Sequence, residues 1–272
     1  MEPEPVKRTW PAAGLKAALA LAVGLVLLGW LLNTPPGLLG KADALGYAVC
    51  HRIDLRSFHL GERALPLCAR CSGMYLGAML GLAYQAIRRP RRSGMPIRPV
   101  QAILVVFVLA FALDGINSFF SLFSPSIPVY EPQNWLRLVT GSGMGLAIAL
   151  VLFPAYNQTV WKVQDRRPAM DSLADLAGLL ALTGLLILAL LSGSPVLLYP
   201  LALISAAGVL VLLTLVYSMI WLMVLRRDNT IRQARELLWP VIAGFGTALL
   251  QIVLLDLARY ALTGTWDGFH FG

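Results

Sequence analysis

All three cysteines and two of the three histidines lie within 22 consecutive residues of this chain. The cluster consists of Cys50-His51, His59 and Cys68-Ala69-Arg70-Cys71. Thiolate and imidazole groups are ligands that suit zinc, and a Cys-x-x-Cys turn directs two sulfurs toward one point, as in half of a tetrahedral zinc site. The spacing therefore predicts a site for zinc or a similar divalent metal on Cys50, His51, Cys68 and Cys71, with His59 as an alternative fourth ligand.

Two other interpretations of the cluster stay open. Cys68 and Cys71 at the start of a helix could form a reactive disulfide with a lowered thiolate pKa, and Cys50 would then act as the resolving thiol. The chain would in that case be a membrane thiol-disulfide oxidoreductase coupled to a quinone. Alternatively, the cluster is only a structural metal or disulfide staple in a transporter or an assembly subunit.

Arginines are interleaved with the cluster. They are Arg52, Arg56, Arg63 and Arg70. Guanidinium groups match phosphate and carboxylate geometry, so we expect Arg52, Arg56 and Arg70 to bind an anionic substrate. Pairing with Asp54 and Glu62 is the alternative role of these side chains.

The composition places this chemistry in a membrane protein. Hydrophobic residues make up 58% of the 272 residues, charged residues 13%, and the mean hydropathy is +0.71. Soluble domains hold about 25% charged residues, so soluble, disordered and disulfide-stapled classes are excluded. We expect an all-α, polytopic transmembrane helix bundle, in which an anionic lipid or isoprenoid is the natural substrate of the arginines. About seven stretches can span ~30 Å of hydrocarbon: Ala13–Leu32, Leu67–Ile87, Val100–Phe120, Trp135–Tyr156, Leu173–Leu191, Val196–Leu225 and Leu238–Leu262.

The net charge of +8 predicts the orientation of these spans. With the N-terminus in the cytoplasm, the cytoplasmic segments carry 15 of the 22 basic residues, including Lys7, Arg8 and Lys16 before the first span. Cytoplasmic loops hold such an excess, so the charge indicates topology in a multi-pass plasma-membrane protein and not a nucleic-acid partner. The first span could instead be a signal peptide, but its length favours a retained anchor.

The loop from Asn33 to Pro66 is then the longest one on the outer side. Leu38, Ala42, Leu45 and Val49 recur at helical spacing, which predicts a short amphipathic helix lying on the outer leaflet. Such a helix would hold Cys50 near the start of the second span.

Polar residues inside the spans agree in depth with the cysteine cluster. Asp114, Arg137 and Asp256 all fall in the outer half of the membrane, where ionisable side chains usually mark a site. We therefore expect one outward-facing polar site, with Asp114 as the proton acceptor and Arg137 as a catalytic cation. The alternatives are structural pairs, Asp114 with Arg137 across helices and Asp256 with Arg259 along one helix.

Small residues predict close helix contacts within the bundle. Gly73, Gly77 and Gly81 form a small-xxx-small stripe, and Gly141-Ser142-Gly143-Met144-Gly145 lies within a span. Both patterns indicate helix packing, because no strand precedes the second one as a nucleotide-binding loop would require.

Two blocks of residues resemble a known family. The first is Cys50-His51-Arg52, Arg56-Ser57-Phe58 and Pro66 to Gly77, and the second is Asp114-Gly115, Asn117, Asn134, Leu136-Arg137 and Thr140-Gly141. Together they are similar to the predicted membrane proteins of domain of unknown function 2085, except that Asn117 stands where the family pattern has Gln. The resemblance implies that the two blocks belong together, and it names no activity.

The resemblance covers roughly Tyr47 to Gly145. It suggests a division into residues 1–145, with the Cys/His loop and the family-like motifs, and residues 146–272, with the remaining membrane helices. We expect the two parts to form one integrated membrane domain.

Overall fold

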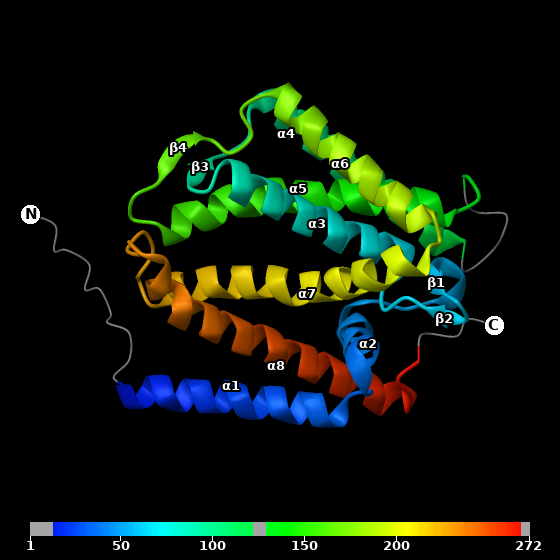
Figure 1. Ribbon diagram of the computed structural model, residues 1–272, viewed down its shortest axis with the longest axis horizontal. Helices are drawn as coiled ribbons and strands as arrows, with labels where there is room; N and C mark the ends of the chain where they lie inside the picture. Colours follow the sequence, from blue (N-terminus) through cyan, green and yellow to red (C-terminus); the bar gives the residue numbers. More distant parts are fainter. Residues whose placement is uncertain (1–12, 122–128, 268–272) are drawn as a thin grey trace, which may run out of the picture.

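The computed structural model describes residues 13–121 and 129–267 as a bundle of long helices (Figure 1). The helices are α1 (Ala13–Asn33), α2 (Gly37–Val49), α3 (Ala69–Arg88), α4 (Arg98–Phe120), α5 (Asn134–Val160), α6 (Leu173–Leu191), α7 (Pro195–Val224) and α8 (Leu238–Thr263). Short 3-10 turns, η1 (Asp54–Arg56) and η2 (Ala234–Leu237), and four short strands lie in the connections: β1 (His59–Leu60), β2 (Arg63–Ala64), β3 (Arg92–Gly94) and β4 (Asp165–Pro168). The strands form two pairs, antiparallel β1–β2 and parallel β3–β4.

The helices confirm the expected all-α bundle. Within the described residues, six are long and apolar enough to cross a membrane, namely α1, α4, α5, α6, α7 and the segment Ala234–Thr263 that contains α8. The remaining predicted span, Leu67–Ile87, corresponds to α3, whose 20 residues would extend about 30 Å. Its sequence is less apolar because it packs against α5 and α7 in the middle of the bundle, with little surface left for lipid.

Close contact between α3 and α5 forms the centre of the bundle, as the glycine pattern predicts. A Cβ atom at Gly77 would lie 2.5 Å from the Ser142 carbonyl oxygen, and one at Gly145 would lie 2.0 Å from the Met74 carbonyl oxygen. Only a hydrogen atom fits at these positions, so the two backbones approach as in small-residue membrane packing.

Helix α2 exists where the apolar spacing predicts it, but its neighbours differ from the expectation. It runs across the long helices and packs against α7 and α8, with Ala42 and Leu45 buried and Leu38 exposed. Burial within the bundle fixes the end of this helix more firmly than a leaflet surface could, because packed side chains surround it on several sides.

The ends of the bundle differ in chemistry. One end holds the start of α1, the β3–β4 pair and the α7–α8 connection, which carry most of the basic residues. The other end holds α2, the β1–β2 hairpin and the start of α3. Glu2, Glu4, Lys7 and Arg8 lie outside the described residues.

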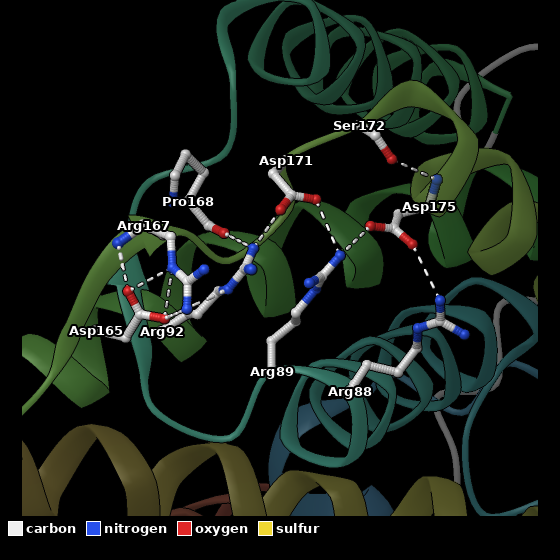
Figure 2. A network of polar contacts seen from close by, with 9 residues as sticks. All are labelled: Arg88, Arg89, Arg92, Asp165, Arg167, Pro168, Asp171, Ser172 and Asp175. Carbon is white, nitrogen blue, oxygen red and sulfur yellow. Dashed lines mark hydrogen bonds and ion pairs between the residues drawn. The ribbon is translucent and has the colours of Figure 1, made fainter.

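An ion-pair network fastens the end of α3 to the segment that leads into α6 (Figure 2). Arg89 bridges Asp171 and Asp175, with the shorter distance, 2.8 Å, to an oxygen of Asp175. The remaining pairs are Arg88–Asp175, Arg92–Asp165, Arg92–Asp171 and Arg167–Asp165. The Ser172 hydroxyl also caps α6 by accepting from the Asp175 N–H at 3.0 Å.

The division expected between residues 145 and 146 falls inside α5. One buried cluster joins Leu45, Cys50 and Cys68 to Val209 and Leu249 from the later helices. We propose on this basis that the two parts form one integrated membrane unit.

Candidate functional site

Three elements bring the cysteines together. Cys50 caps the C-terminus of α2, Cys68 caps the N-terminus of α3, and Cys71 lies in the first turn of α3. Their three sulfur atoms all lie within 4.8 Å of one another, and the three thiols are free. The Cys68 N–H donates to the Cys50 Sγ at 3.4 Å. We call this set the three-cysteine group.

Gly46 and Arg259 fix the end of α2 that carries Cys50. A Cβ atom at Gly46 would lie 1.9 Å from the Pro66 carbonyl oxygen, so only glycine lets α2 come this close to the segment before Cys68. The Arg259 Nη1 donates to the carbonyl oxygens of Tyr47 and Cys50, both at 2.6 Å. These carbonyls end a helix and have no partner within it, so a side chain from α8 satisfies them.

The two histidines of this region, His51 and His59, bind partners other than the cysteines. The His51 Nδ1 accepts the Ile53 N–H at 3.2 Å, which assigns the ring proton to Nε2 and makes that nitrogen a donor. The structure leaves His51 and His59 outside the three-cysteine group. His59 is 2.9 Å from an Asp54 carboxylate oxygen at the surface.

Hydrogen bonding within the three-cysteine group changes the pKa of the Cys50 thiol. Bonds from Cys68 and Cys71 lower the pKa of the Cys50 thiol well below its ordinary value. Burial lowers the pKa of His51, so this imidazole is neutral at pH 7. The group thus combines a stabilised thiolate with an uncharged N–H donor nearby.

A second polar cluster surrounds Asp114 on α4. The Arg70 Nε donates to the Asp114 carboxylate at 3.0 Å, and its Nη2 donates to the same carboxylate and to the Ser118 hydroxyl. The Tyr130 hydroxyl donates to the other carboxylate oxygen at 2.9 Å, and the Thr140 hydroxyl adds a contact at 3.3 Å. Arg70 is therefore the ion-pair partner of Asp114.

Arg137 makes other contacts than the structural pair with Asp114 that the sequence offers as an alternative. Its Nη1 donates to the Asn134 side chain at 2.7 Å, and its Nε lies 3.4 Å from the Ser118 hydroxyl. Arg70 lies in the first turn of α3, which packs closely against α5 at Gly141, and its long side chain reaches from there to Asp114 on α4. Arg137 and the Asp114 partner Arg70 thus share one neighbour, the Ser118 hydroxyl.

Arg56 joins this cluster, whereas Arg52 does not. The Arg56 Nη2 donates to the Ser118 carbonyl oxygen at 2.8 Å. Arg52 instead pairs with Asp43 at 2.9 Å, and Arg63 contacts the same carboxylate. Asp43 is a partner that the sequence pattern does not indicate, because it lies on α2, before the loop that carries both arginines.

The two clusters adjoin, and positive charge dominates there. Arg56, Arg70 and Arg137 are buried or nearly so, and Asp114 is the carboxylate among them. His51 lies within electrostatic reach of all three guanidinium groups, and Cys68 within reach of Arg56. Burial lowers the pKa of Arg56, as expected for a cation withdrawn from water. We call Arg56, Arg70, Arg137 and Asp114 together the arginine cluster.

Asp256 and Arg259 on α8 make different hydrogen bonds. The Trp30 Nε1 donates to the Asp256 Oδ2 at 3.3 Å, while Arg259 contacts the end of α2. The sequence marks both residues as polar groups in a span, but only the fold shows that Arg259 positions Cys50. The role of Gly46 is also visible only in three dimensions.

Comparison with known proteins identifies relatives of this region. A family model described as "Predicted membrane protein (DUF2085)" matches residues 50–151. An uncharacterised protein of Methanocaldococcus jannaschii is 26% identical over 115 residues, which cover 42% of this chain and 67% of that protein. An uncharacterised protein of Methanothermobacter thermautotrophicus is 30% identical over 102 residues, which cover 37% of this chain and 82% of that protein. No solved structure matches.

The matched residues contain both the three-cysteine group and Asp114 with its partners, whereas α1, α6, α7 and α8 lie outside them. The second relative is aligned over most of its own length. The resemblance based on the cysteine and Asp114 blocks is thereby confirmed, and the chain belongs to the DUF2085 family of predicted membrane proteins.

Proposed function

We propose that this membrane protein binds a thiophilic metal ion, zinc or a similar divalent ion, on Cys50, Cys68 and Cys71. The observation that carries the proposal is the mutual approach of three sulfurs within 4.8 Å, those of Cys50 and Cys68 buried and that of Cys71 half-buried. Soft thiolate ligands select metals of this kind. Three protein ligands leave the fourth position of a tetrahedral ion for water or a bound ligand, as in catalytic zinc sites.

The charge near the group supports this assignment. Three thiolates and a divalent ion carry a net charge of −1, and the arginine cluster carries three positive charges and one negative. Buried charges must be compensated, so the arginines favour the metal-thiolate centre. They also leave a positive excess for an additional anion.

We infer that this anion is the ligand or substrate, and we favour an anionic lipid or isoprenoid because the site lies within a helix bundle. In this proposal Arg56, Arg70 and Arg137 attract the anionic group, and Asp114 keeps Arg70 in place or accepts a proton. Arg52 contributes less than the sequence suggests, since Asp43 already pairs with it. The imidazole Nε2–H of His51 is a further donor toward the site.

A thiol oxidoreductase is the second candidate. Cys68 and Cys71 form a Cys-x-x-Cys turn at the start of α3, and the Cys50 sulfur, whose thiol pKa is lowered, lies beside both. Oxidation of two thiols to one disulfide would release two electrons and two protons, which a membrane quinone would take up as it becomes a quinol. Differential alkylation of cells grown with and without oxygen tests this candidate, since thiols that are always reduced exclude it.

Metal analysis of the purified full chain tests the first proposal. We expect about one zinc or similar ion per chain, its loss in Cys68→Ser and Cys71→Ser, and its retention in His51→Ala. His59→Ala is a matched control, because this exposed imidazole pairs with Asp54. Absence of metal in the unmodified protein, or undiminished metal in the cysteine variants, would refute the assignment.

A purely structural staple predicts a different pattern. In that case the cysteine variants would unfold, and substitution of Asp114 or Arg137 would leave the function intact. Elution volume in detergent and helicity of each variant separate loss of metal from loss of fold.

A further inference from the structure

A second cavity lies between α1 and α8, away from the arginine cluster. Its volume is about 550 Å³. The polar and aromatic residues that line it are Trp30, Asn33, Thr34, Asp256, Tyr260 and Trp266. Val26, Leu250, Val253 and Leu257 supply apolar surface. The cavity therefore has an aromatic and polar part next to an aliphatic part.

Asp256 is the charged side chain among these lining residues. It is 3% exposed, and its Oδ1 accepts no hydrogen bond from the described part of the chain. The Oδ2 accepts the Trp30 Nε1–H at 3.3 Å. A buried carboxylate oxygen without a donor is costly, and an ionisable group inside a membrane usually marks a site.

Neighbouring cations do not fill this position. The Arg259 Nη1 donates to the carbonyl oxygens at the end of α2, at 2.6 Å. Lys41 donates to the carbonyl and the hydroxyl of Thr34, at 2.9 Å and 2.8 Å. Both groups donate to other oxygens, and the Lys41 Nζ also lies 5.9 Å from the centroid of the Trp30 ring. The Asp256 Oδ1 therefore stays in the cavity wall without a hydrogen bond from the described residues.

Three aromatic side chains, Trp30, Tyr260 and Trp266, line the cavity together with Asp256. Trp266 packs against Tyr260, with ring centroids 5.6 Å apart, and Trp30 holds the carboxylate through its indole N–H. Aromatic faces attract ammonium groups, and sites for quaternary ammonium ligands combine several such rings. We propose that this cavity binds an amphiphile with a cationic amine or ammonium head, held by Asp256 and the aromatic rings, and an alkyl tail along α1 and α8.

Another cavity, between α4 and α5, differs from the α1–α8 cavity in its lining. A cavity of about 500 Å³ between α4 and α5 is lined by Leu104, Val108, Met144 and similar residues, without a charged side chain. Such a surface would accept any alkyl chain. Selectivity for a cationic head therefore separates the proposed site from general lipid contact.

Titration calorimetry of the purified full chain in dodecyl maltoside micelles tests the proposal. The probes are dodecyltrimethylammonium, uncharged dodecanol and tetramethylammonium. We expect the cationic amphiphile to bind roughly tenfold or more tightly than either of the other two. Equal affinity for dodecanol would overturn the cationic head, and equal affinity for tetramethylammonium would overturn the amphiphile.

Two variants localise the binding. Asp256→Asn keeps the side-chain shape and should remove the preference for the cation. Gly29→Leu should block binding by filling the cavity, because a Cβ atom at Gly29 meets no atom within 4 Å. Gly24→Leu is the matched control on α1, since Gly24 is equally open but does not line the cavity.

The second variant keeps the test decisive if Asp256→Asn fails to fold. Retained cation preference in folded Gly29→Leu, or its loss in Gly24→Leu as well, would overturn the proposed location. The metal content of the three-cysteine group is a separate readout, and failure of either proposal leaves the other one standing.

Discussion

At the scale of single residues, the ion pair between Arg70 and Asp114 is the contact of the site that is most sensitive to substitution. Asp114 is 1% exposed and receives bonds from α3, α5 and Tyr130. Burial and the bond to Asp114 raise the pKa of Tyr130 to about 12, so its hydroxyl stays a donor. A carboxylate in such a place depends on every cation and hydroxyl around it.

Removal of Arg70 should therefore be severe. We expect Arg70→Met to lower the free energy of unfolding by about 3–5 kcal/mol, because it leaves a buried charge without its counter-ion. The double variant Arg70→Met with Asp114→Leu should lose less than the sum of the single variants. Unfolding in mixed detergent micelles measures these values. Arg63→Met serves as the control, with a loss of about 1 kcal/mol or less expected for its half-exposed pair with Asp43.

Ligand chemistry and the depth of polar residues in the spans predict that the cysteines and the Asp114 block lie at one end of the bundle, which the fold confirms. The partner of Asp114 could not be predicted, because depth does not tell which face of a helix a residue occupies. By depth alone, Arg70 and Arg137 are equally plausible ion-pair partners of Asp114, and the packing between α3 and α5 decides between them.

At the scale of elements, the approach of α2 to the start of α3 assembles the three-cysteine group. The contact depends on Gly46, because any larger side chain would collide with the Pro66 carbonyl group. Apolar spacing predicts the helix itself, but its burial against α7 and α8 depends on distant residues such as Arg259. Long apolar helices are thus predictable from sequence, while a short connecting helix acquires its place from the bundle.

Gly46→Ala should separate Cys50 from Cys68. We expect loss of most of the bound metal and faster alkylation of Cys50 while the long helices stay folded. Gly24→Ala is the control, since a Cβ atom there meets no neighbour within 4 Å. Mass spectrometry after timed alkylation gives the rates, and a Gly46→Ala protein with native metal content and native alkylation would contradict this role.

The network in Figure 2 makes the other end of the bundle sensitive to acid. Hydrogen bonds from Arg167 and the charge of Arg92 lower the pKa of Asp165 to about 2, and Arg92 lowers that of Asp171. The unfolded value is about 3.9. A lowered folded pKa stabilises the fold above about pH 4, and this contribution is lost as the pH falls toward 2.

Thermal unfolding in detergent between pH 7 and pH 2.5 measures this effect. We expect the unfolding temperature to fall below pH 4, and to fall less steeply in Asp165→Asn and Asp171→Asn. Asp228→Asn, on the exposed turn after α7, is the control and should follow the unmodified protein. Parallel curves for all four proteins would exclude the network as the acid-sensitive element.

At the scale of the whole molecule, the separation of basic residues from the cysteine end suggests how the bundle lies in the membrane. The β3–β4 pair and the α7–α8 connection share one end, and α2 and the β1–β2 hairpin share the other. Because cytoplasmic segments retain Lys and Arg, we propose that the first end faces the cytoplasm and the three-cysteine group faces outward. The arginine cluster and the α1–α8 cavity would then both open toward the outer half of the plasma membrane.

Labelling of introduced cysteines in intact cells tests this orientation. Leu55 and Val163 are 85% and 71% exposed. The Leu55 carbonyl accepts from Asn134 at the start of α5, and Val163 follows the end of α5, so Leu55→Cys and Val163→Cys form a matched pair at opposite ends of this helix. An impermeant maleimide should label Leu55→Cys in intact cells and Val163→Cys only after permeabilisation. The unmodified protein gives the background, which comes mainly from the half-buried Cys71 because Cys50 and Cys68 are buried. The reverse labelling pattern would show the opposite orientation, with the proposed metal site facing the cytoplasm. Reducing conditions there would favour a thiolate-metal centre and exclude a stable disulfide.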